Sequence, residues 1–126
     1  MSLQGLTILV TGGAGYIGSH VCVELIQAGF KVVILDNLSN SSIEAIERIK
    51  KITNKPINFY HCDVNSSTEL DKIFNNHKVD AVIHLAGLKS VSESVENPEK
   101  YYLNNVNGSI NLFNAMKKFN CKKIVF

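Results

Sequence analysis

Thr11-Gly12-Gly13-Ala14-Gly15-Tyr16-Ile17-Gly18 follows directly after an apolar run, Leu6 to Val10, and spaces its glycines in the pattern GxxGxxG. We expect Gly12 to permit a tight turn and Gly15 to let the backbone approach a pyrophosphate, while Gly18 lets the next helix pack close to the strand. Amides at the start of that helix would face the phosphates. Because the glycines stand between a strand and an amphipathic helix, the pattern favours a dinucleotide site over a merely structural turn.

Further apolar runs predict a parallel sheet. They are short, nearly continuous and rich in β-branched residues, as expected of strands covered on both faces, and comprise residues 32–35, 81–85 and 124–126. The strand at the second of these is expected over residues 79–85. Residues 57–62 mix polar and apolar side chains, which is typical of an edge strand. With helical segments between the runs, the sequence predicts an α/β fold of the Rossmann type, a doubly wound parallel sheet with strand order 3-2-1-4-5. We expect one incomplete domain, residues 1–126, truncated after the fifth strand.

Apolar side chains spaced by three and four predict which helix faces are buried. In the first helix these are Ile17, Val21, Leu25 and Ala28, and Gly29 supplies the stop. The second helix is expected over residues 42–52. The other expected faces are Leu70, Ile73 and Phe74 in a helix capped near Ser66, and Tyr102, Val106, Ile110, Phe113 and Met116 in a long helix from Pro98 to about Phe119.

Composition narrows the class of protein. With 126 residues, 45% of them hydrophobic, and a net charge of +2, the chain is typical of a globular domain and carries too little charge to predict nucleic acid or a membrane surface as a partner. Without a signal peptide or a membrane-length apolar run, we expect a cytoplasmic protein. Cys22, Cys62 and Cys121 are odd in number and lack CxxC or Cys/His spacing, so they predict free thiols and no metal site.

Carboxylates follow two of the predicted strands. Asp36 ends the second strand, where it would accept the adenine-ribose hydroxyls and repel a 2′-phosphate, so NAD is favoured over NADP. The alternative is a solvated Asp in a turn. After the third strand, Asp63 would receive the adenine amino group, with the Val64 amide at a ring nitrogen. Alternatively, Asp63 caps the next helix.

The fourth predicted strand leads into Leu85-Ala86-Gly87-Leu88-Lys89. Small residues there would let the chain run close under the cofactor, and Lys89 would neutralise phosphate or bond to a ribose, unless it is simply solvated. We expect His84, on the buried strand before it, to be a satisfied core residue rather than a ligand or base.

Catalytic residues are not predicted within the chain. Reductases of this architecture use a Tyr with a Lys four residues later for proton transfer, and no tyrosine here has that partner. Any catalytic residues are therefore expected beyond Phe126. Two interpretations stay open: part of a dinucleotide-dependent enzyme, or a non-catalytic NAD-binding module.

Together these motifs make the chain resemble the extended short-chain dehydrogenase/reductase family. The resemblance rests first on residues 11–18. More selective are residues 35–41 (LDNLSNS), residues 84–95 (HLAGLKSVSESV), and Pro98, Tyr101-Tyr102 and Asn104-Asn105-Val106-Asn107-Gly108. Those stretches are similar to the family's nucleotide-sugar 4-epimerases. Its dehydratases and decarboxylases share the glycines but usually diverge in the AGLKxVxESV segment.

The resemblance implies an NAD site made by residues from every loop at this edge of the sheet. The residues at the pyrophosphate would be Gly12, Gly15, Tyr16, Ile17 and Gly18, and those at the adenosine ribose and its phosphate would be Asp36, Asn37, Asn40 and Ser41. The adenine would contact Asp63 and Val64. The residues on the nicotinamide side would be Leu85, Ala86, Gly87, Lys89 and Asn104.

The resemblance also implies an activity: interconversion of UDP-glucose and UDP-galactose through a 4-keto intermediate, with NAD held tightly. A UDP-hexose would be the substrate. Another NAD-dependent enzyme of nucleotide sugars is the alternative. Family members usually form homodimers through the helix that follows Pro98. Without the proton-transfer pair, we expect the chain alone to be inactive.

Overall fold

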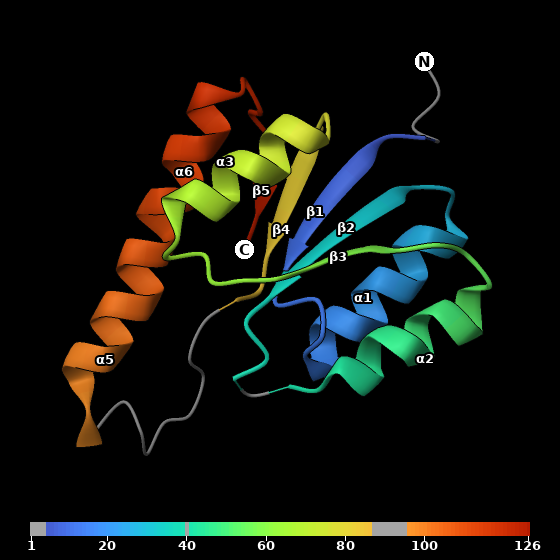
Figure 1. Ribbon diagram of the computed structural model, residues 1–126, viewed down its shortest axis with the longest axis horizontal. Coiled ribbons are helices and arrows are strands. Elements are labelled where there is room, and N and C mark those ends of the chain that lie inside the picture. The colour runs from blue at the N-terminus through green and yellow to red at the C-terminus, as the bar shows by residue number, and fades with distance from the viewer. Residues whose placement is uncertain (1–4, 40, 87–95) are drawn as a thin grey trace.

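The computed structural model describes residues 5–39, 41–86 and 96–126 and shows a parallel five-stranded sheet of order β3-β2-β1-β4-β5 (Figure 1). This confirms the predicted doubly wound sheet. Within these ranges, no helix is both long and apolar enough to cross a membrane. The elements are β1 Thr7–Thr11, α1 Tyr16–Gln27, β2 Lys31–Asp36, α2 Ile43–Thr53, β3 Asn58–His61, α3 Ser67–Asn76, β4 Ala81–His84, α5 Pro98–Tyr102, the π-helical segment η1 Leu103–Asn107, α6 Gly108–Lys118 and β5 Ile124–Val125.

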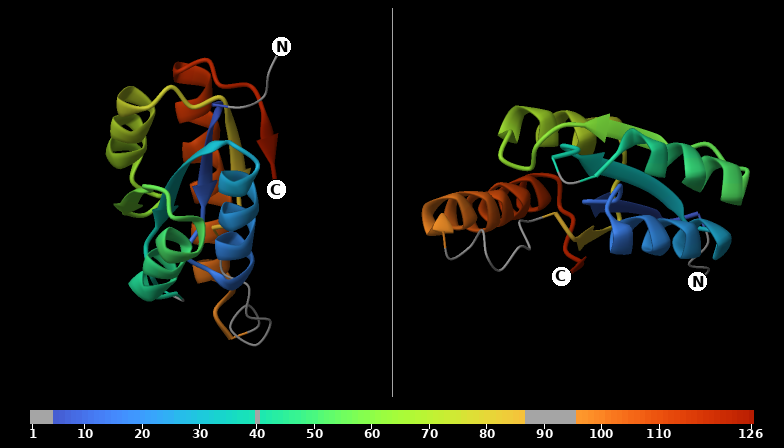
Figure 2. Two further views of the ribbon diagram at one scale, coloured as in Figure 1. Left: turned by 90° about the vertical axis from the view of Figure 1, so that its right-hand side faces the viewer. Right: turned by 90° about the horizontal axis from the view of Figure 1, so that it is seen from below.

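Helices cover both faces of the sheet, as the apolar strands require (Figure 2). Alternate residues of each strand face opposite sides, so Leu9 and Val33 pack with α3 and α6. Their neighbours Val10 and Ile34 pack with α1 and α2. The central strands therefore lie between two hydrophobic cores. The carboxyl ends of these strands lie at one edge of the sheet, which we call the rim.

Helix α1 buries a different face from the predicted one. Gly18, Cys22 and Ile26 are buried, whereas Ile17 is 57% exposed. A Cβ at Gly18 would overlap the carbonyl oxygen of Gly12, so helix and turn meet at this glycine. Residues one and two turns further along, at i+4 and i+8, consequently face the sheet. The predicted face was wrong for Ile17 and Ala28, which are exposed, because it ignored this close approach. Val21 and Leu25 are half-buried, and Leu25 packs against the core at the side of the buried face.

The predictions for α3 and β3 are confirmed. Ser66 caps α3, since its Oγ accepts a hydrogen bond of 3.4 Å from the Glu69 amide. Leu70, Ile73 and Phe74 are the buried residues of α3. Strand β3 lies at the edge of the sheet, with no fully buried residue.

The helical stretch after Pro98 is interrupted by a π-helical turn and buries Gly108, Leu112, Ala115 and Met116. Gly108 fits closely against α3's preceding loop: a Cβ there would lie 2.6 Å from Val64 Cγ2. Of the apolar residues predicted on one face, Met116 is buried, but Val106, Ile110 and Phe113 are 37%, 49% and 42% exposed. Val106 in η1 and Ile110 and Phe113 in α6 thus leave apolar area exposed outside the buried face, and we call these three residues the outer face. Phe113 also packs against the ring of Phe126, with 5.8 Å between centroids.

Candidate functional site

The loops named by the sequence gather at the carboxyl end of the sheet. Thr11 is level with Leu35 on one side and His84 on the other, and Asp36 is level with His61. The loops after β1, β2 and β4 accordingly leave the sheet at the same end (Figure 1). In open α/β sheets, ligands bind outside the carboxyl ends of the strands, where the order reverses. Here that reversal lies between β1 and β4.

Gly12 makes the turn after β1 possible for two reasons. Its φ is +73°, a conformation that other residues adopt only with strain. In addition, a Cβ would lie 2.8 Å from the Ala86 nitrogen and 2.8 Å from the Leu85 carbonyl carbon. The turn therefore rests directly on the backbone that follows β4, and these two segments can occupy this arrangement only with glycine at position 12.

Gly15 differs, because its backbone angle does not require a glycine. Its φ of −73° is ordinary, and among the described residues a Cβ would lie close to one atom, the Gly12 carbonyl oxygen, at a tight 3.3 Å. It occupies the N-cap of α1 without a side chain to cap the first amides. Tyr16 and Ile17 beside it are 83% and 57% exposed. An uncapped twelve-residue helix with a bare backbone at its start fits a pyrophosphate.

Asp36 is not a solvated turn residue, since its exposed fraction is only 6%. One carboxylate oxygen accepts a hydrogen bond of 3.0 Å from the Ala14 amide in the glycine turn. The other accepts bonds of 2.8 Å from the Leu38 amide and 3.0 Å from Ser41 Oγ. Asp36 thus joins two loops of the rim. A carboxylate offers about four acceptor sites, so a ribose hydroxyl can join these donors.

A smaller cluster joins the ends of β2 and β3, the predicted adenine side. Asn37 Nδ2 donates to Asp63 Oδ2 at 3.3 Å, and His61 Nε2 donates to the Asn37 carbonyl oxygen at 3.1 Å. Asp63 Oδ1 accepts from the backbone amide and side chain of Asn65, both at 2.9 Å. The N-cap of α3 is Ser66, so the alternative of Asp63 as that cap is wrong.

Sequence reasoning missed Asn111 on α6. Its Nδ2 donates to the carbonyl oxygens of Val64 and Asn65, at 3.4 and 2.9 Å, and so fixes the loop after β3. Val64 is only 6% exposed as a whole residue, and its side chain packs towards Gly108, so that side chain is not available to a ligand. A polar residue between the apolar positions of α6 was the one sequence signal for this contact.

On the predicted nicotinamide side, Leu85 and Ala86 lie against the glycine turn. Asn40, Gly87, Lys89 and the side chain of Asn104 lie outside the described residues, so their roles stay predictions. His84 is confirmed as a buried core residue: its exposed fraction is 8%, and Nδ1 lies 2.6 Å from Thr11 Oγ1. Thr11, fully buried, was not among the predicted site residues.

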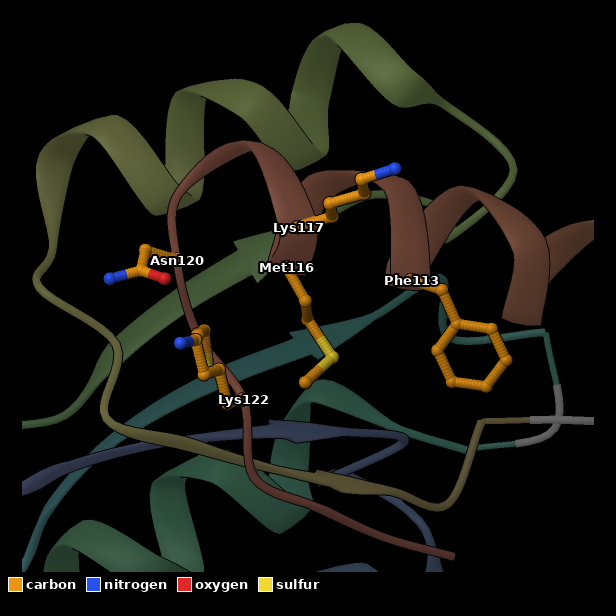
Figure 3. A pocket seen from close by; sticks show the side chains of 6 residues that line it. Phe113, Met116, Lys117, Asn120 and Lys122 are labelled. Carbon is orange, nitrogen blue, oxygen red and sulfur yellow. The ribbon is translucent and has the colours of Figure 1, made fainter.

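A concavity of about 390 Å³ lies elsewhere, along α6 and the turn into β5 (Figure 3). None of its lining residues belongs to the predicted cofactor site. Phe113 and Met116 reach into it from α6, whereas Lys117 projects away. Its other lining residues are Asn120, Cys121 and Lys122.

A chain with this fold and this rim is of the dinucleotide-binding class. A model of the NAD dependent epimerase/dehydratase family matches residues 8–126, and the chain belongs to that family. Similar proteins include UDP-glucose 4-epimerase of Bacillus subtilis, 55% identical over 96% of this chain, and UDP-glucose 4-epimerase uge1 of Schizosaccharomyces pombe, 55% identical over 95%. The chain spans 36% and 34% of the length of these two relatives.

Solved structures agree in fold. UDP-glucose 4-epimerase from Bifidobacterium longum, in complex with NAD⁺ and UDP, superimposes with a TM-score of 0.94 at 47% identity, over 95% of this chain and 36% of that one. The enzyme from Stenotrophomonas maltophila, with bound NAD and formylated UDP-arabinopyranose, gives a TM-score of 0.93 at 45% identity, over 96% and 36%.

Proposed function

We propose that this chain binds NAD and forms the cofactor-binding part of a UDP-glucose 4-epimerase. Two observations support this proposal: the similarity to UDP-glucose 4-epimerases at 55% identity, and the NAD bound in the two superimposed structures. A UDP-hexose is the proposed substrate, and conversion between UDP-glucose and UDP-galactose the proposed reaction. When bound, NAD supplies reversible hydride transfer at C4 of the hexose.

Gly15 is the observation that carries NAD binding. The turn does not need glycine at this position for its backbone angle, and within the described part of the chain a Cβ would have one close contact, at 3.3 Å from the Gly12 carbonyl oxygen. A pyrophosphate that approaches the backbone closely would explain why this position carries no side chain. The first turn of α1 then binds the phosphates, and Asp36 binds the ribose. The cluster around Asp63 binds the adenine, and the backbone of Leu85 and Ala86 lies on the nicotinamide side.

The proposed role of the chain's own residues is to bind and orient the cofactor. No Tyr-x-x-x-Lys pair occurs in the sequence to transfer the proton of a sugar hydroxyl. We therefore expect no turnover of UDP-galactose by the purified chain. Formation of UDP-glucose by it would contradict this expectation.

Calorimetric titration of the chain with NAD and NADP tests the cofactor assignment. We expect NAD to bind at least about tenfold more tightly than NADP, because Asp36 repels a 2′-phosphate. Asp36→Ala removes that preference, and Gly15→Ala weakens both dinucleotides in a chain that still folds. Glu24→Ala, an exposed acidic residue on α1, is the matched control and leaves both affinities unchanged. If neither dinucleotide binds to a folded chain, the proposed site is wrong.

We also propose a cytoplasmic homodimer formed through the outer face, which lies on η1 and α6. The free thiols fit a reducing compartment. Side chains of Val106, Ile110 and Phe113 leave apolar area uncovered along one side of the helix. Sedimentation equilibrium should show a dimer that Ile110→Ser dissociates. A monomer at every concentration would contradict the proposed dimer.

A further inference from the structure

A line of hydrogen bonds crosses the rim from the backbone after β4 to the helix beside it. The amides of Leu85 and Ala86 both donate to Thr11 Oγ1, at 3.1 Å. Thr11 Oγ1 lies 2.6 Å from Nδ1 of His84, whose Nε2 lies 3.3 Å from Ser109 Oγ. Ser109 Oγ in turn donates to the carbonyl oxygen of Asn105 at 2.8 Å. The line joins β4, β1, α6 and the π-helical segment η1.

The hydrogen bonds of Thr11 and Ser109 favour one protonation state of His84. Thr11 Oγ1 already accepts two amide protons, so its own proton goes to Nδ1. Ser109 uses its proton on the Asn105 carbonyl oxygen, so it accepts from Nε2. Both contacts favour the same state of the His84 ring, which is neutral with its proton on Nε2. Every bond then points in one direction, and such chains strengthen one another.

The line does more than satisfy buried polar groups. The Leu85 amide also donates to the Thr11 carbonyl oxygen at 3.0 Å, so that amide has a partner without the hydroxyl. Valine would fill a buried strand position at Thr11 without introducing a polar atom. What the hydroxyl adds is a hydrogen bond from the Ala86 amide, which lies where Gly12 approaches the backbone of Leu85 and Ala86.

We propose that Thr11 and His84 are positioning residues that set the backbone of Leu85 and Ala86 against the glycine turn and register it to η1. This inference rests on the proposed function, because that backbone is the proposed nicotinamide side of the NAD site. η1 contains Asn104, the helix residue predicted to reach the cofactor. His84 thus couples two parts of the site that are adjacent in space but distant in the chain. π-turns of this kind occur frequently at functional sites.

The test begins without ligand. Long-range ¹H–¹⁵N correlation spectra of the ¹⁵N-labelled chain at neutral pH distinguish the protonated from the unprotonated ring nitrogen of each histidine. We expect His84 to be neutral with its proton on Nε2, with the exposed His20 as an internal comparison. A charged ring, or a proton on Nδ1, overturns the inference whether or not NAD binds.

Variants then test positioning. Thr11→Ser keeps the hydroxyl, and we expect it to preserve the His84 tautomer, slow hydrogen exchange of the Ala86 amide, and NAD affinity within about twofold. Thr11→Val should mix the tautomers, expose the Ala86 amide to exchange and weaken NAD about tenfold. Equal exchange and affinity in the two variants overturns the proposal. Should Thr11→Val not fold, Ser109→Ala replaces it, with the same loss of tautomer purity expected. If the wild-type chain binds no NAD, the proposed function is wrong. The tautomer of His84 and the exchange rate of the Ala86 amide then still show whether Thr11 and His84 position the backbone after β4.

Discussion

Replacing Gly12 with alanine should destabilise the chain for two separable reasons. Its φ of +73° costs an alanine about 1–2 kcal/mol. The new Cβ would also lie 2.8 Å from the Ala86 nitrogen and the Leu85 carbonyl carbon, backbone atoms that cannot rotate away. Overpacking of this kind costs about 1–3 kcal/mol. We therefore expect Gly12→Ala to lose about 2–5 kcal/mol, a large part of the 5–15 kcal/mol typical of a domain.

Gly5 supplies the matched control. Its φ is +84°, yet a Cβ there has no neighbour within 4 Å among the residues that the structure describes, so Gly5→Ala carries the conformational cost alone. Guanidinium unfolding of the wild type and both variants, followed by circular dichroism, gives each free energy of unfolding. The difference between the variants should be about 1–3 kcal/mol. If both lose the same amount, the contact between the turn and the backbone after β4 does not constrain the fold, and the argument from Gly12 is refuted.

Two further substitutions test the buried groups beside the turn. Asp36→Asn puts an amide NH₂ group opposite a backbone or hydroxyl donor, so we expect the free energy of unfolding to fall by about 1–3 kcal/mol. Hydrogen exchange of the Ala14 amide should become faster, because this amide donates to the carboxylate of Asp36. Unchanged exchange would show that the hydrogen bond to Ala14 is not formed. Burial raises the pKa of the Cys22 thiol from 9.0 to about 12, so the unfolded chain loses this proton first and stability falls as pH rises above 9. Unfolding measured up to pH about 10.5 should show a decline of at most about 1.4 kcal/mol per pH unit that Cys22→Ala reduces; identical pH profiles would contradict the assigned burial.

The sequence predicts the sheet well because its strands carry their own signal. Buried parallel strands such as β1 and β2 are continuous apolar runs, and glycines with a following acid mark the rim between them. The buried face of α1 was not predictable in the same way. Ile17 and Val21 lie on one side of this helix and Cys22 and Ile26 on another, so apolar spacing allows both, and the choice depends on how closely Gly18 approaches Gly12.

Contacts between distant side chains were the other limit. Thr11 and His84 are 73 positions apart, and nothing in either local pattern indicates that their side chains meet. Asp36 was expected to bind a ribose, but its bond to the Ala14 amide depends on the exact geometry of the turn. Asn111 likewise acts on the loop after β3 from a helix 46 residues away.

The strand order also has a kinetic consequence. Strand β1 lies at the centre of the sheet, yet its neighbour β4 joins only after the chain has passed through β2 and β3. The glycine turn rests on Leu85 and Ala86, so it cannot become ordered until the most sequence-distant pairing of β1 has formed. Loop closure over such separations is slow. During refolding, pulsed hydrogen exchange should therefore protect amides between β1 and β2 before those of Ala14 and Ala86, and the reverse order would contradict this sequence of events. On a ribosome, the rim would acquire its final geometry only after β4 has emerged.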